Sequence, residues 1–424
     1  MSFEWREITL GDFLTLKRGY DLPKSKRKDG HIPIISSSGF SGVHNVPMVD
    51  GPGVVTGRYG TIGQVFYIPE KYWPLNTTLY VEDFKGNSPL FIYYLLQTIN
   101  FHTYSDKAAV PGINRNHVHM ANIRVPTSRT AQDKIALILK KIDDKIISNQ
   151  NINKILEQIA QTLFKSWFVD FEPVKAKMEV LEAGGSQEDA TLAAMTAISG
   201  KDTDALAIFE RESPEQYAEL KNTAELFPSA MQDSELGEIP EGWSSQRFSN
   251  IATLNYGKAL KKTERIEGPY PVYGSGGITG SHNNYLIEGP SVIVGRKGSI
   301  GTLYWEDGKF HPIDTVYYVV NKDGIPLSYL YYLMETLNLP RMNTDAAVPG
   351  LNRDNVYRLE VLKPILSVLN KFNSHISAIR NMIQKNNVST ATLTVLRDTL
   401  LPKLLSGEIT LPEAEQTVSE VENV

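Results

Sequence analysis

Cysteine is absent from the 424 residues of the chain. Disulfides and thiolate metal sites are therefore excluded, and the composition suits a reducing cytoplasm. No apolar run approaches the ~20 residues that a membrane-spanning helix requires. The first residues, MSFEWREITL, include acidic side chains and no apolar core, so we expect neither a signal peptide nor contact with a membrane.

The sequence motifs of the common enzyme classes are missing as well. There is no GxxxxGK[ST] phosphate loop for a nucleotide-driven motor, and no Asn-Pro-Pro-aromatic tetrapeptide to grip an adenine amino group for methyl transfer. The eight histidines have no HExxH spacing, and no GxSxG elbow surrounds the serines at 36–38. The sequence therefore predicts no catalytic residue, no metal site and no cofactor.

Charged residues are unevenly distributed, although the net charge is only −5. Fifteen acidic residues oppose five basic ones between Pro173 and Gly242, and the stretch after Thr410 adds four glutamates and no base. The rest of the chain holds 38 basic and 29 acidic residues. This positive excess suits a polyanionic partner.

What the chain does contain is a long internal repeat. GRYGTIG at Gly57–Gly63 returns as GRKGSIG at Gly295–Gly301, and AAVPGINRNHV at Ala108–Val118 returns as AAVPGLNRDNV at Ala346–Val356. Both pairs are separated by 238 residues, and single residues such as Trp5 and Trp243 keep the same shift. A constant shift without insertions predicts two copies of one fold. Two similar copies suit an extended partner with two similar places to bind.

Each copy, residues 1–128 and 238–366, is expected to be a mixed α/β (α+β) domain. The runs GVVTG, QVFYI and TLYVE in the first copy, and SVIVG, GTLYW and TVYYVV in the second, are typical of strands. SPLFIYYLLQTI and IPLSYLYYLMETL have the pattern of a helix. The order of the strands is not predicted.

A long helix is expected after each copy, at 129–170 and 367–406. Apolar residues alternate at spacings of three and four, which predicts a narrow seam that pairs two helices. Each arm could instead cover its own domain, but at ~50–57 Å it is too long to lie on one small domain. The predicted seam consists of Ile135, Ile138, Ile142, Ile152, Leu156, Ile159 and Leu163, and of Leu369, Phe372, Ile376, Ile379, Ile383, Leu393, Leu400 and Leu404.

The acidic segment 171–237 has no counterpart in the first half of the chain. Its composition predicts either a mobile linker or small helices that dock loosely. The last segment, 407–424, is expected to be a tail.

Three recurring features are candidates for contacts with DNA. The glycines of GRYGTIG and GRKGSIG allow a tight turn that presents Arg58 or Arg296, and such an arginine can bind guanine or a phosphate. Lys24 and Arg27 recur in the second copy and suit phosphate contacts. The loops SSSGFSGVHN and GSGGITGSHN suit polar contacts with base edges. The alternatives are a plain hairpin turn, a solvated basic loop and a self-capped loop.

The complete set of candidate DNA-binding residues follows from these features and from the AAVPG motif. It comprises Lys24, Arg27, Ser38, His44, Arg58, Tyr59, Thr61, Asn114 and Arg115 in the first copy, and Lys262, Arg265, Ser275, His282, Arg296, Lys297, Ser299, Asn352 and Arg353 in the second.

The arrangement resembles the specificity (S) subunit of type I restriction–modification systems over nearly the whole chain. QTLFKSWFVDFEPVKAKM (Gln161–Met178), DSELGEIPEGW (Asp233–Trp243) and TLLPKLLSGEI (Thr399–Ile409) are similar to the family's joints between helix and recognition domain. AAVPGINRNHV followed by IRVP is similar to the end of a recognition domain. The family's Pro-Pro-x-x-Glu-Gln entry to the helix is replaced by PTSRTAQDKI and KPILSVLNKF.

The resemblance implies a non-catalytic DNA-recognition subunit. Each globular domain would be a target recognition domain that reads half of a bipartite site in double-stranded DNA. The helices would bind two methyltransferase (modification) subunits, and motor/endonuclease (restriction) subunits would join through the complex. The residues then assigned to the subunit interface are Ile135, Ile142, Asn149, Leu156, Leu163, Ile376, Ile383, Asn386, Leu393 and Leu400.

The order of copies and helices predicts an antiparallel coiled coil with pseudo-twofold symmetry. Lys145 and Asn149 interrupt the first seam, and Asn386 and Thr390 the second. We expect Asn149 to lie within about 10 Å of Asn386 at the midpoint and to fix the register, solvent exposure being the alternative. The coil would then hold half-site centres about one DNA turn, roughly 34 Å, apart.

Two functions of other classes stay open at this point. In a duplicated nucleotide-binding enzyme, GRYGTIG and GRKGSIG would be phosphate loops, each followed by a helix. QVFYIPE and TLYWEDG look like strands instead, which speaks against this reading. In a protein-binding scaffold, the helices would dimerise and the globular copies would bind protein.

Overall fold

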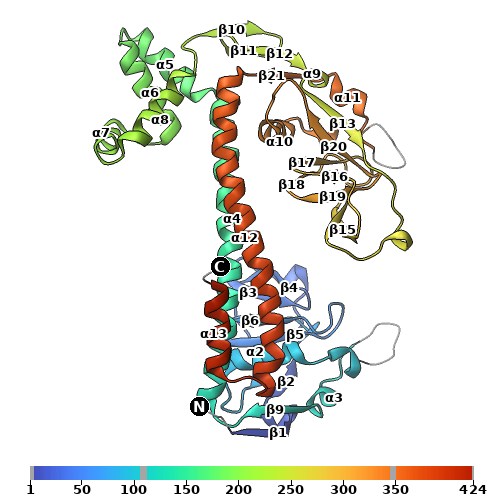
Figure 1. Cartoon of the computed structure of the whole chain (residues 1–424). Helices are drawn as coiled ribbons and strands as arrows, with labels where there is room; N and C mark the ends of the chain where they lie inside the picture. Colours follow the sequence, from blue (N-terminus) through green and yellow to red (C-terminus); the bar gives the residue numbers. More distant parts are fainter. Residues whose placement is uncertain (1–3, 106–111, 344–349, 423–424) are drawn as a thin grey trace. The chain divides into compact units, whose positions relative to one another are not determined.

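The computed structural model describes residues 4–105, 112–343 and 350–422 (Figure 1). Its contacts divide the chain into two compact units, Met1–Ile152 with Lys385–Val424, and Asn153–Gln384. Each unit therefore contains one copy of the repeat together with parts of both long helices. Residues Ala108–Pro111 and Ala346–Pro349 of the repeated AAVPG motif lie outside the described residues.

The main sheet of each copy has four antiparallel strands in the same order. Its central strands β5 and β17 are buried at every residue, which their β-branched sequences GVVTG and SVIVG suit. The order is β2 (Thr15–Arg18), β8 (Thr78–Asp83), β5 (Gly53–Gly57), β6 (Val65–Ile68) in the first copy, and β13 (Ala252–Tyr256), β20 (Val316–Asn321), β17 (Ser291–Gly295), β18 (Leu303–Glu306) in the second.

A smaller sheet and a two-stranded ribbon recur as well. The smaller sheets have the orders β4-β3-β7 and β15-β14-β19-β16, and the ribbons pair β1 with β9 and β12 with β21. The bounds are β4 Gly39–His44, β3 Ile32–Ser36, β7 Trp73–Pro74, β15 Gly277–His282, β14 Tyr270–Gly274, β19 Lys309–Pro312, β16 Ile287–Glu288, β1 Trp5–Thr9, β9 Asn122–Pro126, β12 Ser244–Arg247 and β21 Glu360–Lys363.

The helices of each copy also correspond. The expected helices are α2 (Pro89–Thr98) and α10 (Leu327–Thr336), so this prediction is confirmed together with the six strand predictions. Ser88 caps α2 by accepting the N–H of Phe91. The shorter helices are α1 (Leu10–Phe13) and α3 (Arg115–His119) in the first copy, and α9 (Phe248–Ile251) and α11 (Arg353–Tyr357) in the second.

The long helices are α4 (Arg129–Phe168) and α12 (Leu366–Ser406). Within each unit they pair antiparallel. In unit 1, Asn149 of α4 donates a hydrogen bond to Ser389 of α12 at 3.2 Å, and Arg397 of α12 forms an ion pair with Asp143 of α4. In unit 2, Arg380 of α12 forms an ion pair with Glu157 of α4.

The helix ends complete the cores of the globular copies. In unit 2 the rings of Phe164 and Phe168 pack against Tyr329, and Phe168 also packs against Trp243. In unit 1 the leucines near the end of α12 join the core of the first copy, at Leu400, Leu401, Leu404 and Leu405. The segments QTLFKSWF and TLLPKLL are therefore joints because each supplies core side chains to the copy at which its helix ends.

The seam predicted for α12 is confirmed. In the seam predicted for α4 two positions, Ile152 and Ile159, are wrong, whereas the other apolar positions, Ile138 among them, are buried or half-buried. Ile152 and Ile159 are 39% and 50% exposed, and Lys145 is exposed, whereas Ile146 is 7% exposed. One set of positions recurs every seven residues and belongs to both of the possible heptad frames. It consists of Ile135, Ile142, Asn149, Leu156 and Leu163. The alternate positions that face inward are one residue later than predicted, at Leu139, Ile146, Asn153 and Ala160.

The expected polar contact is present near the midpoint of α4, within unit 1. Asn149 is only 2% exposed, so solvent exposure of this side chain is wrong as an alternative. Its partner Ser389 lies one helical turn beyond the half-buried Asn386, on the same face. The contact agrees with the expected neighbourhood of Asn149 and Asn386, and the 34 Å spacing of half-sites stays a prediction.

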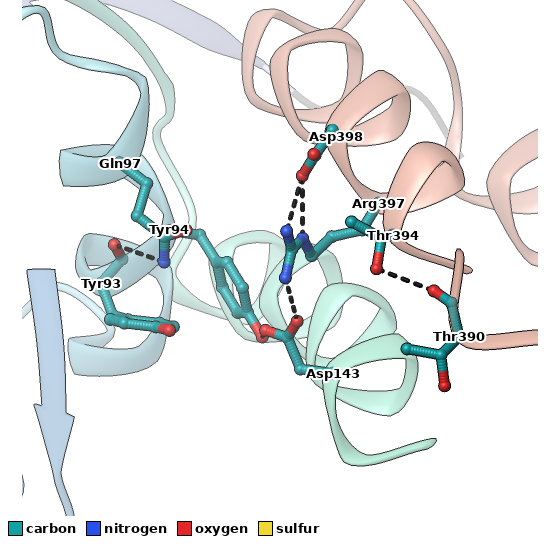
Figure 2. Close-up of polar contacts among 8 residues, drawn as sticks. All are labelled: Tyr93, Tyr94, Gln97, Asp143, Thr390, Thr394, Arg397 and Asp398. Carbon is teal, nitrogen blue, oxygen red and sulfur yellow. Dashed lines mark hydrogen bonds and ion pairs between the residues drawn. The ribbon is translucent and has the colours of Figure 1, made fainter. Parts of the chain in front are cut away.

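A buried tyrosine anchors the helix pair to each copy. Figure 2 shows the anchor of unit 1, where Tyr94 of α2 donates to Asp143 at 2.8 Å and Asp143 also accepts from Arg397 at 3.0 Å. Burial raises the pKa of Tyr94 above its ordinary value. In unit 2 the matching Tyr332 accepts a hydrogen bond from Arg380 at 3.1 Å. In both units the tyrosine thus lies beside an acid–arginine pair that joins α4 to α12.

The acidic segment is helical, so the linker alternative is wrong. Its helices α6, α7 and α8 share a small core around Met195 and Leu206, and α5 adds Val174 to the main core of unit 2. Their bounds are α5 Glu172–Glu182, α6 Gln187–Ser199, α7 Thr203–Glu212 and α8 Pro214–Glu225. The hairpin of β10 (Met231–Ser234) and β11 (Gly237–Pro240) follows.

The expected tail is also a helix, α13 (Leu411–Glu422). Ala414 and Val418 are buried in the core of unit 1, which explains why the segment is ordered as a helix. Among the described residues, no helix has the length and apolar character needed to span a membrane.

His119 in the first copy and Tyr357 in the second lie at matched positions and each accept a backbone hydrogen bond. The Nε2 atom of His119 accepts the N–H of Leu16 at 2.9 Å, and the hydroxyl of Tyr357 accepts the N–H of Leu254 at 2.9 Å. Burial, helped by Arg115 and Lys85, lowers the pKa of His119. Protonation of His119 would remove the acceptor.

The first prediction tests which isoleucines of α4 face α12, with the same isoleucine-to-alanine substitution at two positions. Ile146→Ala should lower the free energy of unfolding by about 2–5 kcal/mol, because it leaves a cavity in a packed seam. Ile152→Ala should change it by less than about 0.5 kcal/mol, because the side chain is exposed. Urea unfolding curves of both variants give the comparison. Equal losses, or a larger loss for Ile152→Ala, would contradict the frame.

The second prediction concerns the dependence of stability on pH. Because the folded-state pKa of His119 lies below the ordinary value of about 6.5, the unfolded chain binds more protons as the pH falls below that value. The contribution of His119 to stability is complete above about pH 6.5 and is lost on acidification. His119→Tyr, which copies the second domain, should keep the hydrogen bond and reduce the fall in Tm between pH 7.5 and 5.5. An unchanged fall would contradict the assignment.

Candidate nucleic-acid interface

Each copy has an open cleft, and the two clefts are lined by corresponding residues. All nine lining positions of one cleft match those of the other at the shift of 238. The first cleft is lined by Arg18, Arg58, Tyr59, Leu79, Gly112, Ile113, Asn114, Arg115 and Asn116, and the second by Tyr256, Arg296, Lys297, Tyr317, Gly350, Leu351, Asn352, Arg353 and Asp354.

The glycine-rich turn forms one wall of each cleft. The backbone N–H groups of Arg58 and Tyr59 donate to the carbonyl of Thr77 at 2.8 and 3.2 Å, and Arg296 and Lys297 donate to Thr315 at 2.9 and 3.1 Å. Glycine is required in the turn, because the next residue, Gly60 or Gly298, has φ of +77° or +82°. The turn is therefore a fixed platform for its arginine.

The segment before α3 or α11 forms the opposite wall. Ile113 donates its N–H to the carbonyl of Arg58 at 3.1 Å, and Leu351 donates to that of Arg296 at 2.8 Å. These bonds bring together two motifs that lie about fifty residues apart in the sequence. The predicted Asn114, Arg115, Asn352 and Arg353 consequently line the same cleft as the predicted arginines of the turns.

The clefts are rich in cations that lie beside aromatic rings. The guanidinium of Arg58 lies 4.4 Å from the ring centre of Tyr59. In the second cleft, Arg296 and Arg353 lie 4.8 and 5.1 Å from the ring of Tyr256. Arg296 also donates to the neutral backbone carbonyl of Asp314 at 2.8 Å, which leaves its charge uncompensated by that bond. Such a surface attracts anions.

Four of the predicted DNA-binding side chains make hydrogen bonds within their own copies. His44 and His282 are only 7% and 8% exposed, and their Nδ1 atoms accept the backbone N–H groups of Lys28 and Ile266. Arg27 and Arg265 donate to the hairpin carbonyls, at Ser41 and Thr279 respectively. The four side chains recur because they hold the β3–β4 and β14–β15 hairpins.

Other predicted residues lie at the surface but outside the clefts. Lys24 and Lys262 are exposed on short 3-10 turns, and Ser38 and Ser299 are exposed as well. Thr61 and Ser275 are half-buried. The counterpart of Ser275 at the shift of 238 is Ser37, not the predicted Ser38.

The predicted set omits five pairs of cleft positions. Gly112 with Gly350 and Ile113 with Leu351 belong to the wall of the cleft, and the remaining three pairs are Arg18 with Tyr256, Leu79 with Tyr317, and Asn116 with Asp354. Asn116 and Asp354 lie inside the repeated AAVPG motif and could have been found from it. The other two pairs come from β2, β8 and their counterparts, so their position required the order of the strands.

The described residues contain no group of three or more histidines or carboxylates placed to hold a metal ion. The clefts themselves are lined mainly by cations and amides. Their chemistry suits an anion that offers phosphate oxygens and polar edges.

Comparison with known proteins agrees with this arrangement. The family model of the type I restriction modification DNA specificity domain matches residues 3–158 and 240–390. The chain is 31% identical over 335 residues to the type I restriction enzyme HindI specificity subunit of Haemophilus influenzae, which covers 72% of each chain. It is 22% identical over 359 residues to the MjaIX specificity subunit of Methanocaldococcus jannaschii, which covers 76% of this chain and 69% of that one.

A solved structure has the same fold. It is the crystal structure of a type I restriction–modification system S subunit from M. genitalium, with a TM-score of 0.56, 17% sequence identity and coverage of 95% of this chain and 96% of that one. Two copies matched by one family model, the relative at 31% identity and the shared fold agree with each other. The chain belongs to the type I restriction–modification DNA specificity family and is a non-catalytic specificity subunit with two target recognition domains.

Proposed function

We propose that each target recognition domain binds one half of a bipartite site in double-stranded DNA through its arginine-lined cleft. The observation that carries this proposal is the recurrence of the cleft at nine matched positions. The glycine and the asparagine help to build the cleft, whereas the two arginines of each copy place positive charge on its lining. A partner with two similar binding places, such as a DNA duplex, explains the recurrence.

The chemistry of the cleft supports DNA over the two other functions considered. In a nucleotide-binding enzyme a helix should follow the glycine-rich turn, but β6 and β18 follow it here. Clefts lined by several cations suit phosphate groups better than they suit the apolar core of a protein-binding surface. Binding to DNA predicts a steep loss of affinity as salt increases, because arginine contacts release counterions from the phosphates.

We further propose that the exposed faces of α4 and α12 bind two methyltransferase subunits. The residues first assigned to this interface cannot all serve it. Ile376, Leu393 and Leu400 are at most 4% exposed, because they pack inside the chain's own units. The exposed apolar side chains of α4 are better candidates, and Ile155 and Ile159 lie one turn apart in unit 2 with 55% and 50% exposure. Restriction subunits would join through this assembly, in the cytoplasm.

The third prediction tests the clefts one at a time, in the complex with the methyltransferase subunits. Arg58→Ala should weaken DNA binding by roughly 1–3 kcal/mol and affect one half-site, and Arg296→Ala should affect the other. Binding titrations with duplexes mutated in either half measure the effect, and Glu210→Ala on the acidic segment serves as a control. Unchanged affinity in both arginine variants would remove the clefts from the DNA interface.

The fourth prediction tests the surface of α4. The double variant Ile155→Asp, Ile159→Asp should weaken binding of methyltransferase subunits by roughly tenfold or more, because charges would enter an apolar contact. Ile208→Asp is the matched control, because Ile208 is 46% exposed on the separate helix α7. Sedimentation or titration of the purified subunits measures the affinity. Full affinity in the double variant would rule out this face as the docking surface.

A further inference from the structure

The two clefts are not identical, because five of the nine positions differ and four of these five change the chemical character of the side chain. Arginine recurs at 58/296 and 115/353, glycine at 112/350, and asparagine at 114/352. Ile113 and Leu351 are similar and are both 2% exposed. The residues that change are Arg18 to Tyr256, Tyr59 to Lys297, Leu79 to Tyr317, and Asn116 to Asp354.

Some of the shared residues are needed to build the cleft. A Cβ atom on Gly112 would lie 2.1 Å from the ring of Tyr59, so the glycine lets the two walls approach. The side chains of Asn114 and Asn352 accept the N–H groups of Asn116 and Asp354 at 3.0 and 2.8 Å. The shared groups that stay available to a ligand are therefore the two arginines of each cleft. Phosphates are the same at every base pair, so identical arginines suit contacts with the DNA backbone.

One of the four changing positions cannot contact DNA. Leu79 and Tyr317 are each only 1% exposed. The hydroxyl of Tyr317 donates to the carbonyl of Leu351 at 3.0 Å, within the wall of the cleft. This change therefore alters only the internal packing of the cleft wall.

The other three changes alter the hydrogen-bonding groups at the accessible rim of the cleft. Arg18, Asn116, Tyr256, Lys297 and Asp354 are exposed, and Tyr59 is half-buried. The amide of Asn116 can donate and accept, whereas the carboxylate of Asp354 can only accept. Asparagine pairs with the N6 and N7 atoms of adenine, and a carboxylate accepts from the amino group of cytosine. A change of this kind alters which base is preferred.

We infer that positions 18, 59 and 116 of the first domain, and 256, 297 and 354 of the second, determine the base preference of the two half-sites. The arginines at 58, 115, 296 and 353 hold the backbone of either half-site. This inference rests on the proposed function, because it assumes that the clefts contact DNA. Its consequence is that the two half-sites differ at the base pairs that these three positions contact.

The pair Asn116 and Asp354 offers a reciprocal and isosteric test. Asn116→Asp places in the first cleft the group that the second already contains at the same place, capped in the same way. Asp354→Asn does the reverse. Neither change requires a shift of the backbone, because both side chains are exposed and equal in shape. Asn222→Asp, on the exposed side of α8, is the control for the change of charge.

The experiment uses the full chain with its methyltransferase subunits and a library of DNA duplexes, and sequencing reads which sites become methylated. The wild type and Asn222→Asp should give one bipartite motif. Asn116→Asp should change the relative use of two bases by roughly tenfold at one position of one half-site, and Asp354→Asn should do so only in the other half-site.

The outcomes separate the inference from the proposed function. If the wild type gives no bipartite motif, or if Arg58→Ala and Arg296→Ala bind DNA as the wild type does, the proposed function fails. If the wild type gives the motif and both reciprocal variants keep every base preference, the inference fails alone. An equal loss of methylation at all sequences in Asn116→Asp would also overturn it, because that result indicates a backbone contact.

Discussion

The fold depends on one exchange of core residues. Each target recognition domain buries side chains of the helix that comes from the other half of the chain. The second domain receives Phe164 and Phe168 from the end of α4, and the first receives Leu400 and Leu404 from the end of α12. Without these side chains each core would expose a large apolar surface to water. The pairing of the helices and the packing of the domains therefore stabilise each other.

Much of this fold could be predicted from the repeat and from local pattern. Buried strands such as GVVTG and SVIVG were recognisable because β-branched residues stand next to turn residues. The heptad frame of α4 could not be recognised from the local sequence pattern. Apolar residues occupy the alternate positions of both possible frames, and contact with the partner helix decides which of them are buried. The repeat already contained the answer, since Ile376 and Ile383 of α12 correspond to Leu139 and Ile146 at a shift of 237.

A residue that recurs in both copies is not necessarily a binding residue. Arg58 and His44 recur equally well, yet the arginine lines a cleft and the histidine holds a hairpin. Two copies of one fold preserve the groups that shape the domain as well as the groups that bind, so recurrence alone cannot separate them. Tyr256 illustrates the converse case, because it lines the cleft although its counterpart in the other copy is an arginine, so a search for identical residues does not find it.

The ion pairs beside the two tyrosine anchors distinguish α4 from α12. Both acids of the two helix ion pairs, Asp143 and Glu157, belong to α4, and both bases, Arg380 and Arg397, belong to α12. The counterpart of Arg397 in α4 is Ala160, so two identical α4 helices would leave the partly buried Asp143 without a base. The acid and the base of each contact therefore come from helices of different sequence. The partly buried ion pairs thus favour the pairing of α4 with α12 over a pairing of two α4 helices, which would lack both arginines.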